Sequence, residues 1–396
     1  MTHFDPWSAE FIAHPYDAYA ELREHAPVTF YEPTGQWLVS RYEDVSALLR
    51  DRRLGRTYTH RFSHEEFGQT PPDPAHEPFH TLNSNGLLDL EAPDHTRIRR
   101  LISKAFTPRM VESLRPTVAR LADELVGGLL AEGGGDLIAA VAEPLPVAVI
   151  AEMLGVPEAD RGLLRPWSAA ITGMFELNPT PEAAKRAVDA SVEFSDFLRD
   201  LIRERRAAPG TDLVSALVET ELTEQEIVST CVLLLNAGHE ATVNTTGNGW
   251  WALFRNPDQL ALLRSAVDAH LPTAIEELMR YDTPLQMFER WVLEDIEVGG
   301  VRIPRGSEVA LLFGSANRDP ARFAAPDRLD VTRPDNPHIT FGAGIHFCLG
   351  APLARLELTE SYAALLRRAP GLTLLREPTW QPGYVIRGLT ALEVTV

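Results

Sequence analysis

The sequence predicts a mainly α-helical protein with small β-sheets, folded as a single domain. Most of the chain carries apolar residues at the spacing that is typical of helices, and two short stretches have strand character. Apolar residues make up 44% of the 396 residues and charged residues 23%, which is ordinary for a soluble globular protein. A chain of this length can bury a large core, as one domain or as two. No internal repeat or low-complexity tract stands out.

Both strand-rich stretches contain typical turn residues. Near the N-terminus, residues 28–31 and 37–39 flank Glu-Pro-Thr-Gly, which predicts a β-hairpin. The second stretch covers residues 291–312, with Gly-Gly and Pro-Arg-Gly as its turns. Between the two, residues 70–81 contain four prolines and two histidines. That composition predicts a mobile surface loop.

Three predicted helices bear on function. The first begins at a capping box, Thr223 with Glu226, and stays rich in apolar residues until Asn-Pro at 256–257. At roughly 30 residues it is long enough to cross a domain of this size. The second covers residues 272–281, because proline suits the first turn of a helix. The third runs from about residue 350 to the Arg-Arg-Ala-Pro that ends at residue 370.

The overall charge and the N-terminus exclude several classes of protein. The formal net charge is −19 and no long basic run occurs, which argues against a nucleic-acid-binding protein. The first residues lack a basic segment followed by an apolar one, so no signal peptide is predicted. The longest apolar stretches, such as residues 232–235, are too short to span a bilayer. We therefore expect a cytoplasmic protein with no membrane partner.

The chain has two cysteines, Cys231 and Cys348. A structural disulfide is not expected in a reducing compartment, and two cysteines cannot supply a four-cysteine zinc or iron–sulfur site. Cys348 lies in a glycine-rich turn just before a predicted helix, where the helix dipole and free amides favour a thiolate. Taken alone, a cysteine in such a turn is more often a packing residue than a ligand.

The complete pattern at residues 341–350, Phe-Gly-x-Gly-x-His-x-Cys-x-Gly, resembles the haem-binding signature of the cytochrome P-450 superfamily, and every position matches. A dinucleotide-binding fingerprint does not fit, because its third glycine would fall on Phe347. The resemblance implies a cytochrome P-450 fold over residues 1–396, without a fused reductase domain. It implies haem b (iron protoporphyrin IX) as cofactor and Cys348 as the ligand of its iron. The other haem contacts implied in this loop are Phe341, Gly342, His346 and Gly350.

A second motif of the family is Glu-x-x-Arg on a helix upstream of the cysteine, and Glu277 with Arg280 matches it. Both side chains lie on one helical face, one turn apart. The same spacing occurs at 112–115 and 158–161, which we interpret as solvated helix faces. The resemblance implies that Arg328 joins the Glu277–Arg280 pair. A buried ion cluster of this kind holds the fold, so we expect no catalytic role for it.

The two propionates of a buried haem need cationic or hydrogen-bonding partners. The family uses His-x-x-x-Arg, an arginine in a strand and the histidine of the cysteine loop. These correspond here to His95 with Arg99, to Arg290 and to His346. Taken without the cysteine loop, His95 and Arg99 also fit an exposed helix face.

The predicted long helix contains the family's oxygen-activation pattern, with Ala237 and Gly238 as the small residues that make room for O2. Glu240 matches the acid that helps to deliver protons. The alcohol position holds Ala241 instead, and the hydroxyl comes one residue later at Thr242. One residue turns a helical side chain by about 100°, so Thr242 is not expected to substitute directly. We expect an ordered water or a substrate hydroxyl to complete the relay, or oxygen activation to tolerate alanine.

Two nearby residues are interpreted as structural. His239 is a lone histidine on a helix, which is more often hydrogen-bonded than a metal ligand. Cys231, two turns earlier, is expected to pack in the core.

The resemblance implies a monooxygenase that inserts one oxygen atom of O2 into an apolar small molecule. The substrate classes that fit are polyketides or macrolides, terpenoids and steroids. The substrate pocket is expected among residues 60–87, residues 167–177, the long helix, residues 284–288 and residues 384–386. Apolar residues dominate the last two segments.

Electrons are expected from a separate ferredoxin and ferredoxin reductase, because the chain has no second nucleotide-binding domain and lacks the cysteines for an iron–sulfur cluster. Arg97, Arg100, Lys104 and Arg109 form either a basic docking patch for that partner or an ordinary solvated helix. We expect a monomer.

Two rival functions stay open at this stage. One is a haem-thiolate enzyme that does not hydroxylate, for example one that couples phenols or uses peroxide; Ala241 favours it and Glu240 argues against its peroxide branch. The other is a haem-binding sensor or carrier without turnover.

Overall fold

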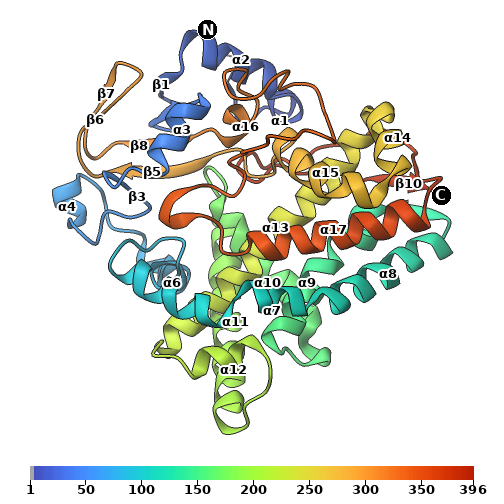
Figure 1. Ribbon diagram of the computed structural model, residues 1–396. Coiled ribbons are helices and arrows are strands. Elements are labelled where there is room, and N and C mark those ends of the chain that lie inside the picture. The colour runs from blue at the N-terminus through green and yellow to red at the C-terminus, as the bar shows by residue number, and fades with distance from the viewer. Residues whose placement is uncertain (1–3) are drawn as a thin grey trace.

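The computed structural model describes residues 4–396 and confirms a mainly helical fold with small sheets. The longest helix, α13 (Glu224–Arg255), runs through the middle of the molecule, and other long helices pack around it (Figure 1). The largest sheet lies to one side, near the N-terminal helices. None of the helices in the described range is long and apolar enough to cross a bilayer.

The remaining helices differ widely in length, from single turns to seven turns. They are α1 (Ala9–Ala13), α2 (Tyr16–His25), α3 (Tyr42–Leu48), α4 (His64–Phe67), α5 (Glu77–Ser84), α6 (Asp94–Ala105), α7 (Pro108–Ser113), α8 (Arg115–Ala131), α9 (Pro144–Leu154), α10 (Leu164–Thr172), α11 (Pro181–Ala207), α12 (Leu213–Val218), α14 (Pro257–Ser265), α15 (Val267–Tyr281), α16 (Phe313–Ala316) and α17 (Ala351–Arg368). Short irregular helical turns are η1 (Pro74–His76), η2 (Ile138–Ala142), η3 (Glu158–Leu163), η4 (Gly173–Phe175) and η5 (Gly344–His346).

The five-stranded sheet joins both of the predicted strand-rich stretches. β1 (Val28–Tyr31) and β2 (Gln36–Val39) form the expected hairpin. β2 then pairs in parallel with β8 (Glu308–Leu311), which comes from the far end of the sequence. β5 (Phe288–Val292) runs antiparallel to β8, and β3 (Leu54–Gly55) completes the order β1-β2-β8-β5-β3. The sheet therefore ties the N-terminal segment to the segment that precedes the cysteine loop.

The other sheets of the described residues are smaller. β6 (Ile296–Val298) and β7 (Val301–Ile303) form a two-stranded hairpin inside the second predicted stretch. β10 (Glu393–Thr395) lies between β4 (Gly134–Asp136) and β9 (Thr373–Leu374). This sheet fastens the end of the described chain beside α8.

Two acidic side chains of the large sheet share one amide. Gln36 lies opposite Glu308 in the parallel pairing, and its Nε2 donates to Glu308 Oε2 at 3.1 Å and to Glu289 Oε1 at 3.0 Å. Burial, and then the negative charge of Glu289, raise the pKa of Glu308 to about 7. The folded sheet therefore favours the protonated form of Glu308.

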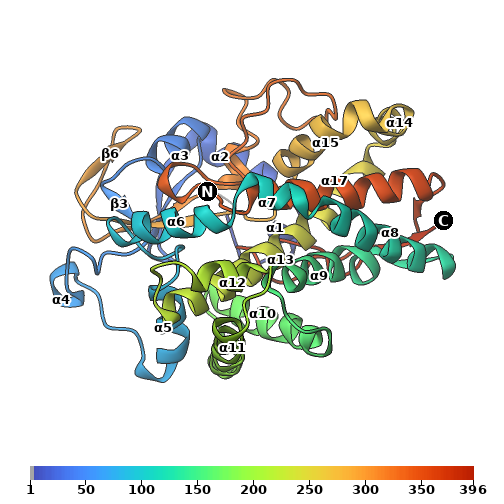
Figure 2. The same ribbon diagram turned by 60° about the horizontal axis from the view of Figure 1, so that its bottom comes forward.

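The capping box predicted for α13 is present. The Thr223 hydroxyl accepts a hydrogen bond from the Glu226 amide at 3.2 Å, and the Glu226 carboxylate accepts one from the Thr223 amide at 2.8 Å. Most of α13 is buried because helices cover it on several sides, with α17 on one side and α9 and α10 on another (Figure 2). Its first half packs in one apolar cluster and its second half in another, so α13 connects the two parts of the core.

The second predicted helix begins earlier than expected. α15 starts at Val267, and Pro272 lies inside it instead of in its first turn. A proline there removes one backbone hydrogen bond and costs stability. The apolar face formed by Leu271, Ala274, Ile275 and Leu278 is fully buried, and its burial offsets that cost.

The loop predicted at residues 70–81 is only partly a loop. Residues 74–76 form η1, and α5 begins at Glu77. Pro74 and Pro78 both stand in first-turn positions, where the missing amide hydrogen is not needed. Proline therefore marks helix starts in this segment.

The ion cluster around Glu277 contains a different arginine from the one expected. Arg280 donates two hydrogen bonds of 2.8 Å to Glu277, as predicted. The second arginine is Arg333, whose Nε lies 3.0 Å from Glu277 Oε2. Arg328 is exposed, and only its backbone carbonyl takes part, accepting from Arg333 at 3.2 Å. The prediction for Arg328 was wrong because Leu329 takes the buried position of this turn and leaves Arg328 facing the solvent.

Candidate active site

The cysteine loop lies between β8 and α17 in the sequence and is held against the N-terminal part of the chain. Gly342 and Gly344 adopt positive φ angles of 68° and 71°, which glycine tolerates best. A Cβ atom on Gly344 would lie 2.4 Å from the Leu49 carbonyl oxygen, so a larger residue does not fit there. The Cys348 amide donates to the Phe341 carbonyl at 3.0 Å, which closes the loop.

The Cys348 thiol stands at the start of α17 and faces a cavity. Burial raises the pKa of this thiol, whereas the amides of Gly350 and Ala351 and the charge of Arg99 lower it. A thiol so placed is desolvated but already surrounded by donors and positive charge, which favours the thiolate once a metal ion neutralises it. The predicted role of Cys348 as a ligand therefore agrees with its surroundings.

The cavity has a volume of about 490 Å³ and brings most of the predicted site residues together. Its wall includes residues from the cysteine loop, from α13 and from β5. The predicted residues that line it are Arg99, Ala237, Gly238, Glu240, Ala241, Thr242, Arg290, Phe341, Gly342, His346, Cys348 and Gly350. His95 is the one predicted site residue that does not line the cavity, and it lies directly behind His346, with ring centroids 4.5 Å apart.

One end of the cavity is rich in positive charge. Both ring nitrogens of His95 are buried and have no hydrogen-bond partner among residues 4–396. Burial, His346 and Arg99 lower the pKa of His95 to about 4. Burial and the nearby Arg56 lower the pKa of Arg290 to about 9. The arginines at this end of the cavity, with the unpartnered His95 imidazole next to His346 behind them, are suited to bind anionic groups.

These residues fit an iron porphyrin. A sulfur ligand stands on the cavity wall, and the cationic end supplies partners for two carboxylates. Gly350 adjoins that sulfur, since a Cβ there would lie at an ordinary van der Waals distance of 3.8 Å from it. The described residues hold no cluster of three or more metal-ligating side chains, so Cys348 would be a lone protein ligand to a metal held by a larger group.

The motifs missed two residues at this end. Arg56 lines the cavity and donates to Asp89 at 2.9 Å. Glu91 Oε1 lies 3.1 Å from His346 Nε2 and accepts a hydrogen bond from the Arg56 backbone amide at 2.7 Å. These two contacts fix the orientation of the Glu91 carboxylate and of the His346 ring. No local sequence signal identifies them, because they become neighbours only through the fold.

The middle of α13 presents the acid Glu240 to the cavity, but the next position, Ala241, carries no hydroxyl. Glu240 is about three-quarters buried, and burial together with the charge of Glu143 raises its pKa. Ala241 follows it, and the hydroxyls of Thr245 and Thr246 donate to the helix carbonyls of Ala241 and Thr242. A relay from Glu240 therefore lacks a side-chain hydroxyl at the expected place.

Gly238 and His239 make structural contacts with other helices. A Cβ on Gly238 would lie 2.7 Å from the Ile150 side chain of α9, so this glycine allows close helix packing as well as lining the cavity. His239 is buried, with Nδ1 3.3 Å from the Ser168 hydroxyl, in agreement with its structural interpretation. Cys231 is fully buried in the core, as predicted.

A second carboxyl of the cavity wall is Glu357 on α17. It is 2% exposed, its Oε1 has no partner among the described residues, and burial raises its pKa well above the usual value. Burial therefore favours its neutral form. The sequence did contain a signal for this residue, because Glu357 stands between two leucines, Leu356 and Leu358. Both leucines are buried in α17.

The apolar part of the cavity comes from α13 and from the four other expected segments. Contributing stretches lie at residues 82–88, 171–176, 284–289 and 385–386. His60, Trp167 and Tyr384, which the expected ranges included, do not line it. Trp167 instead donates to Glu193, and the Tyr384 hydroxyl lies 2.9 Å from that of Tyr19.

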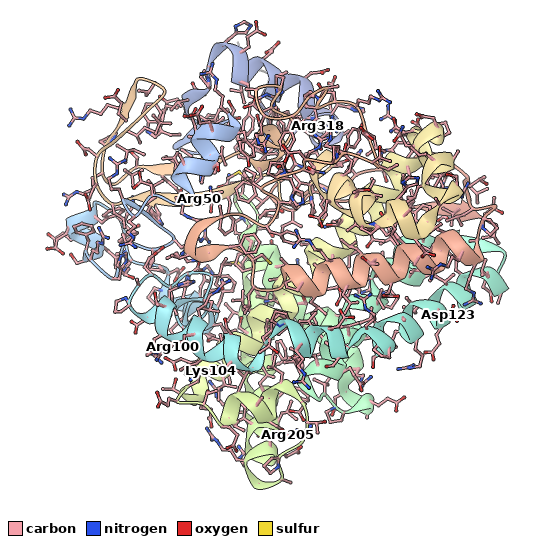
Figure 3. All side chains as sticks on the ribbon, viewed as in Figure 1. Arg50, Arg100, Lys104, Asp123, Arg205 and Arg318 are labelled. Carbon is pink, nitrogen blue, oxygen red and sulfur yellow. The ribbon has the colours of Figure 1, made fainter. Side chains whose placement is uncertain are left out.

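Of the four basic residues predicted to form a docking patch, three are exposed to solvent and one is paired with an acid. Arg97 is engaged by Glu226 and does not belong to an open patch. Arg100 and Lys104 project from α6 into solvent (Figure 3), and Arg109 is also exposed. Ile345 and Phe347 of the cysteine loop are about half exposed. Together these residues give the loop side a mixed apolar and basic surface.

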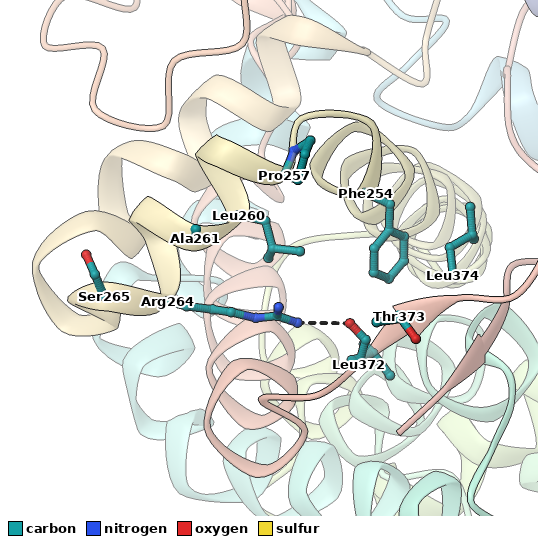
Figure 4. A pocket seen from close by; sticks show the side chains of 9 residues that line it. All are labelled: Phe254, Pro257, Leu260, Ala261, Arg264, Ser265, Leu372, Thr373 and Leu374. Carbon is teal, nitrogen blue, oxygen red and sulfur yellow. Dashed lines mark hydrogen bonds between the residues drawn. The ribbon is translucent and has the colours of Figure 1, made fainter.

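A second hollow lies away from the site. It has a volume of about 580 Å³ and is formed where α13 ends beside α14 and β9, with Arg264 donating to the Leu372 carbonyl at 3.0 Å across it (Figure 4). It contains none of the predicted site residues.

Comparison with known proteins gives a consistent picture. The family model described as "Cytochrome P450" matches residues 166–369. The cytochrome P-450 monooxygenase PikC of Streptomyces venezuelae is 40% identical over 97% of this chain and 92% of its own length. The 6-deoxyerythronolide B hydroxylase of Saccharopolyspora erythraea is 40% identical over 96% of this chain and 95% of its own. The solved structure of PksS, a bacillaene polyketide synthase cytochrome P-450 of Bacillus subtilis, superposes with a TM-score of 0.89 at 36% identity, covering 99% of both chains.

Proposed function

Because this chain belongs to the cytochrome P-450 family and is a monooxygenase of that family, we propose that it holds haem b through Cys348 and hydroxylates a polyketide or macrolide. A ferredoxin, reduced by ferredoxin reductase, is the proposed electron donor. The observation that carries the proposal is a cavity lined by the Cys348 thiol, by Glu240 of α13 and by mostly apolar side chains. The relative named as a 6-deoxyerythronolide B hydroxylase favours a macrolide over a terpenoid or steroid.

Bound haem supplies the activation of O2, with the cysteine thiolate favouring cleavage of the O–O bond. The chain's own residues hold the group and control its surroundings. Cys348 ligates the iron, and the amides of Gly350 and Ala351 temper the basicity of its sulfur. His95, Arg99, Arg290 and His346 are the proposed partners of the propionates.

We expect Glu240 to supply protons to the cavity, because its surroundings favour the neutral carboxyl. Burial raises the pKa of Glu240, so this side chain can hold a proton at its carboxyl oxygen and release it toward the cavity. Ala241 offers no hydroxyl to pass the proton on. We therefore place an ordered water or a hydroxyl of the substrate beside Glu240 as the next member of the relay.

Ligation by Cys348 is tested by matched cysteine variants. Cys348→Ala should lose the thiolate-type absorption band of the ferrous–carbonyl complex. Cys231→Ala changes a buried packing residue outside the cavity and should keep it. Retention of the band in Cys348→Ala would disprove the assignment.

Reaction type and substrate class need a second experiment. Macrolide lactones, terpenoids and steroids are screened for a shift of the ferric haem spectrum, and the compounds that bind are incubated with ferredoxin, its reductase and reduced nicotinamide. We expect a macrolide to gain one oxygen atom. Product formed with hydrogen peroxide but not with ferredoxin would favour the rival peroxide-driven enzyme, and coupled dimers of a phenol would favour oxidative coupling.

A further inference from the structure

Besides Glu357, one neutral polar side chain of the cavity wall has a buried hydrogen-bonding atom without a partner among the described residues. Asn236 lies on α13, is 6% exposed and lines the cavity. Its Oδ1 is shielded and has no hydrogen-bond partner among residues 4–396. A buried amide oxygen without a partner weakens the folded state, so native proteins rarely keep one unless it meets a ligand or an ordered water.

Other polar side chains of the same wall are satisfied within the chain. Each donates to a backbone carbonyl one helical turn earlier, at 2.7 to 2.9 Å. They are Asn83 to Phe79, Thr172 to Ser168, Thr230 to Glu226 and Thr245 to Ala241. Each of these side chains therefore has a partner within the helix that carries it, whereas Asn236 Oδ1 has none among the described residues.

The position of Asn236 relates it to the site of chemistry. It precedes Glu240 by four residues, so both lie on the cavity face of α13, about 6 Å apart along the axis. Leu233 and Ala237 flank it on the same wall. The Asn236 amide is thus a neutral polar group within an apolar surface, one helical turn from the Glu240 carboxyl.

We propose that Asn236 orients the substrate by accepting, at Oδ1, a hydrogen bond from a hydroxyl group that the substrate already carries. A neutral amide recognises a neutral oxygen function, because it offers no charge to compensate an ionised group. Holding that oxygen one turn from Glu240 fixes which carbon of the apolar body is presented for oxidation. This inference rests on the proposed function and narrows its substrate to a molecule oxygenated before it reaches this enzyme.

The test uses two probes that differ in one oxygen atom, cyclododecanol and cyclododecane. Their dissociation constants are measured by the shift of the ferric haem spectrum, which needs no turnover. The wild-type enzyme should bind the alcohol roughly 2- to 10-fold more tightly than the hydrocarbon. Asn236→Leu, which keeps the branched shape of the side chain but has no hydrogen-bonding group, should abolish that preference by weakening the binding of the alcohol relative to the hydrocarbon.

Two further readouts separate substrate binding from a structural role. Without ligand, Asn236→Leu should raise the midpoint of thermal unfolding, because it removes an unsatisfied amide. The control Thr246→Val removes a satisfied hydroxyl from the same helix but outside the cavity lining; it should lower that midpoint and leave the preference for the alcohol intact. With cyclododecanol as substrate, Asn236→Leu should also spread hydroxylation over more ring carbons.

An equal change in the affinity for both probes, or a lower unfolding midpoint in Asn236→Leu, would overturn the inference and assign Asn236 to structure. These outcomes are distinct from failure of the proposed function. In that case the wild-type protein itself would lack the thiolate-type carbonyl band.

Discussion

Replacing Arg333 by alanine should destabilise the protein by about 3 kcal/mol, whereas the same change at Arg328 should have almost no effect. Arg333 is 8% exposed and donates to the fully buried Glu277. A buried hydrogen bond between charged groups contributes roughly 1.5–3 kcal/mol. Arg333 also donates to the carbonyls of Ala324 and Arg328, which lie near the surface and can turn to water, so their loss adds about 1 kcal/mol.

The assay is urea unfolding of the haem-bound protein, followed by far-UV circular dichroism and by the haem absorption together. For a protein of this size the midpoint for Arg333→Ala should fall by on the order of 1 M. Arg328→Ala is the matched control, because exposed substitutions of this kind stay within about 0.5 kcal/mol. If Arg328→Ala costs as much as Arg333→Ala, the assignment of the second arginine is wrong.

Three further changes test other parts of the structure. Gly344→Ala places a Cβ 2.4 Å from the Leu49 carbonyl at a φ of 71°, so we expect the purified variant to hold much less haem per chain, measured by absorbance. Glu308 has a pKa raised to about 7 by burial and by Glu289, so the stability that its protonated form contributes is complete below its unfolded pKa and is lost as pH rises through about 7. Between about pH 5 and pH 8 the wild type should therefore lose about 2–3 kcal/mol more unfolding free energy than Glu308→Gln, and parallel curves would contradict this. Ala241→Thr adds a hydroxyl beside Glu240 and should lower the release of hydrogen peroxide during turnover of a substrate without a hydroxyl; unchanged coupling would argue against a water or substrate hydroxyl in the relay.

The features that sequence alone predicted are those encoded locally. The capping box at Thr223 and Glu226, the glycines of the cysteine loop and the hairpin near residue 30 each depend on residues a few positions apart. Local rules of capping, turn geometry and alternation decide such features. The cysteine loop was also predictable because its function requires a fixed order of residues over one short segment.

Features that depend on distant packing were missed or misassigned. Arg333 replaces Arg328 in the cluster because Leu329 takes the buried position, and no local rule decides which of two nearby arginines turns inward. The unpartnered state of Asn236 becomes visible only when the surrounding helices are in place. Glu91 meets His346 across 255 residues of sequence. The cysteine loop could therefore be predicted from the sequence, whereas the contacts that support it could not.

The parallel pairing of β2 with β8 has a consequence for the newly synthesised chain. β2 ends at Val39 and β8 begins at Glu308, so roughly 270 residues must leave the ribosome before the sheet can close. At about 5–20 residues per second, the hairpin of β1 and β2 waits on the order of 10 to 50 s with one edge unpaired. An open strand edge invites pairing with other chains. Slower synthesis, or a chaperone that covers this hairpin, therefore bears directly on how much protein reaches the folded, haem-binding state.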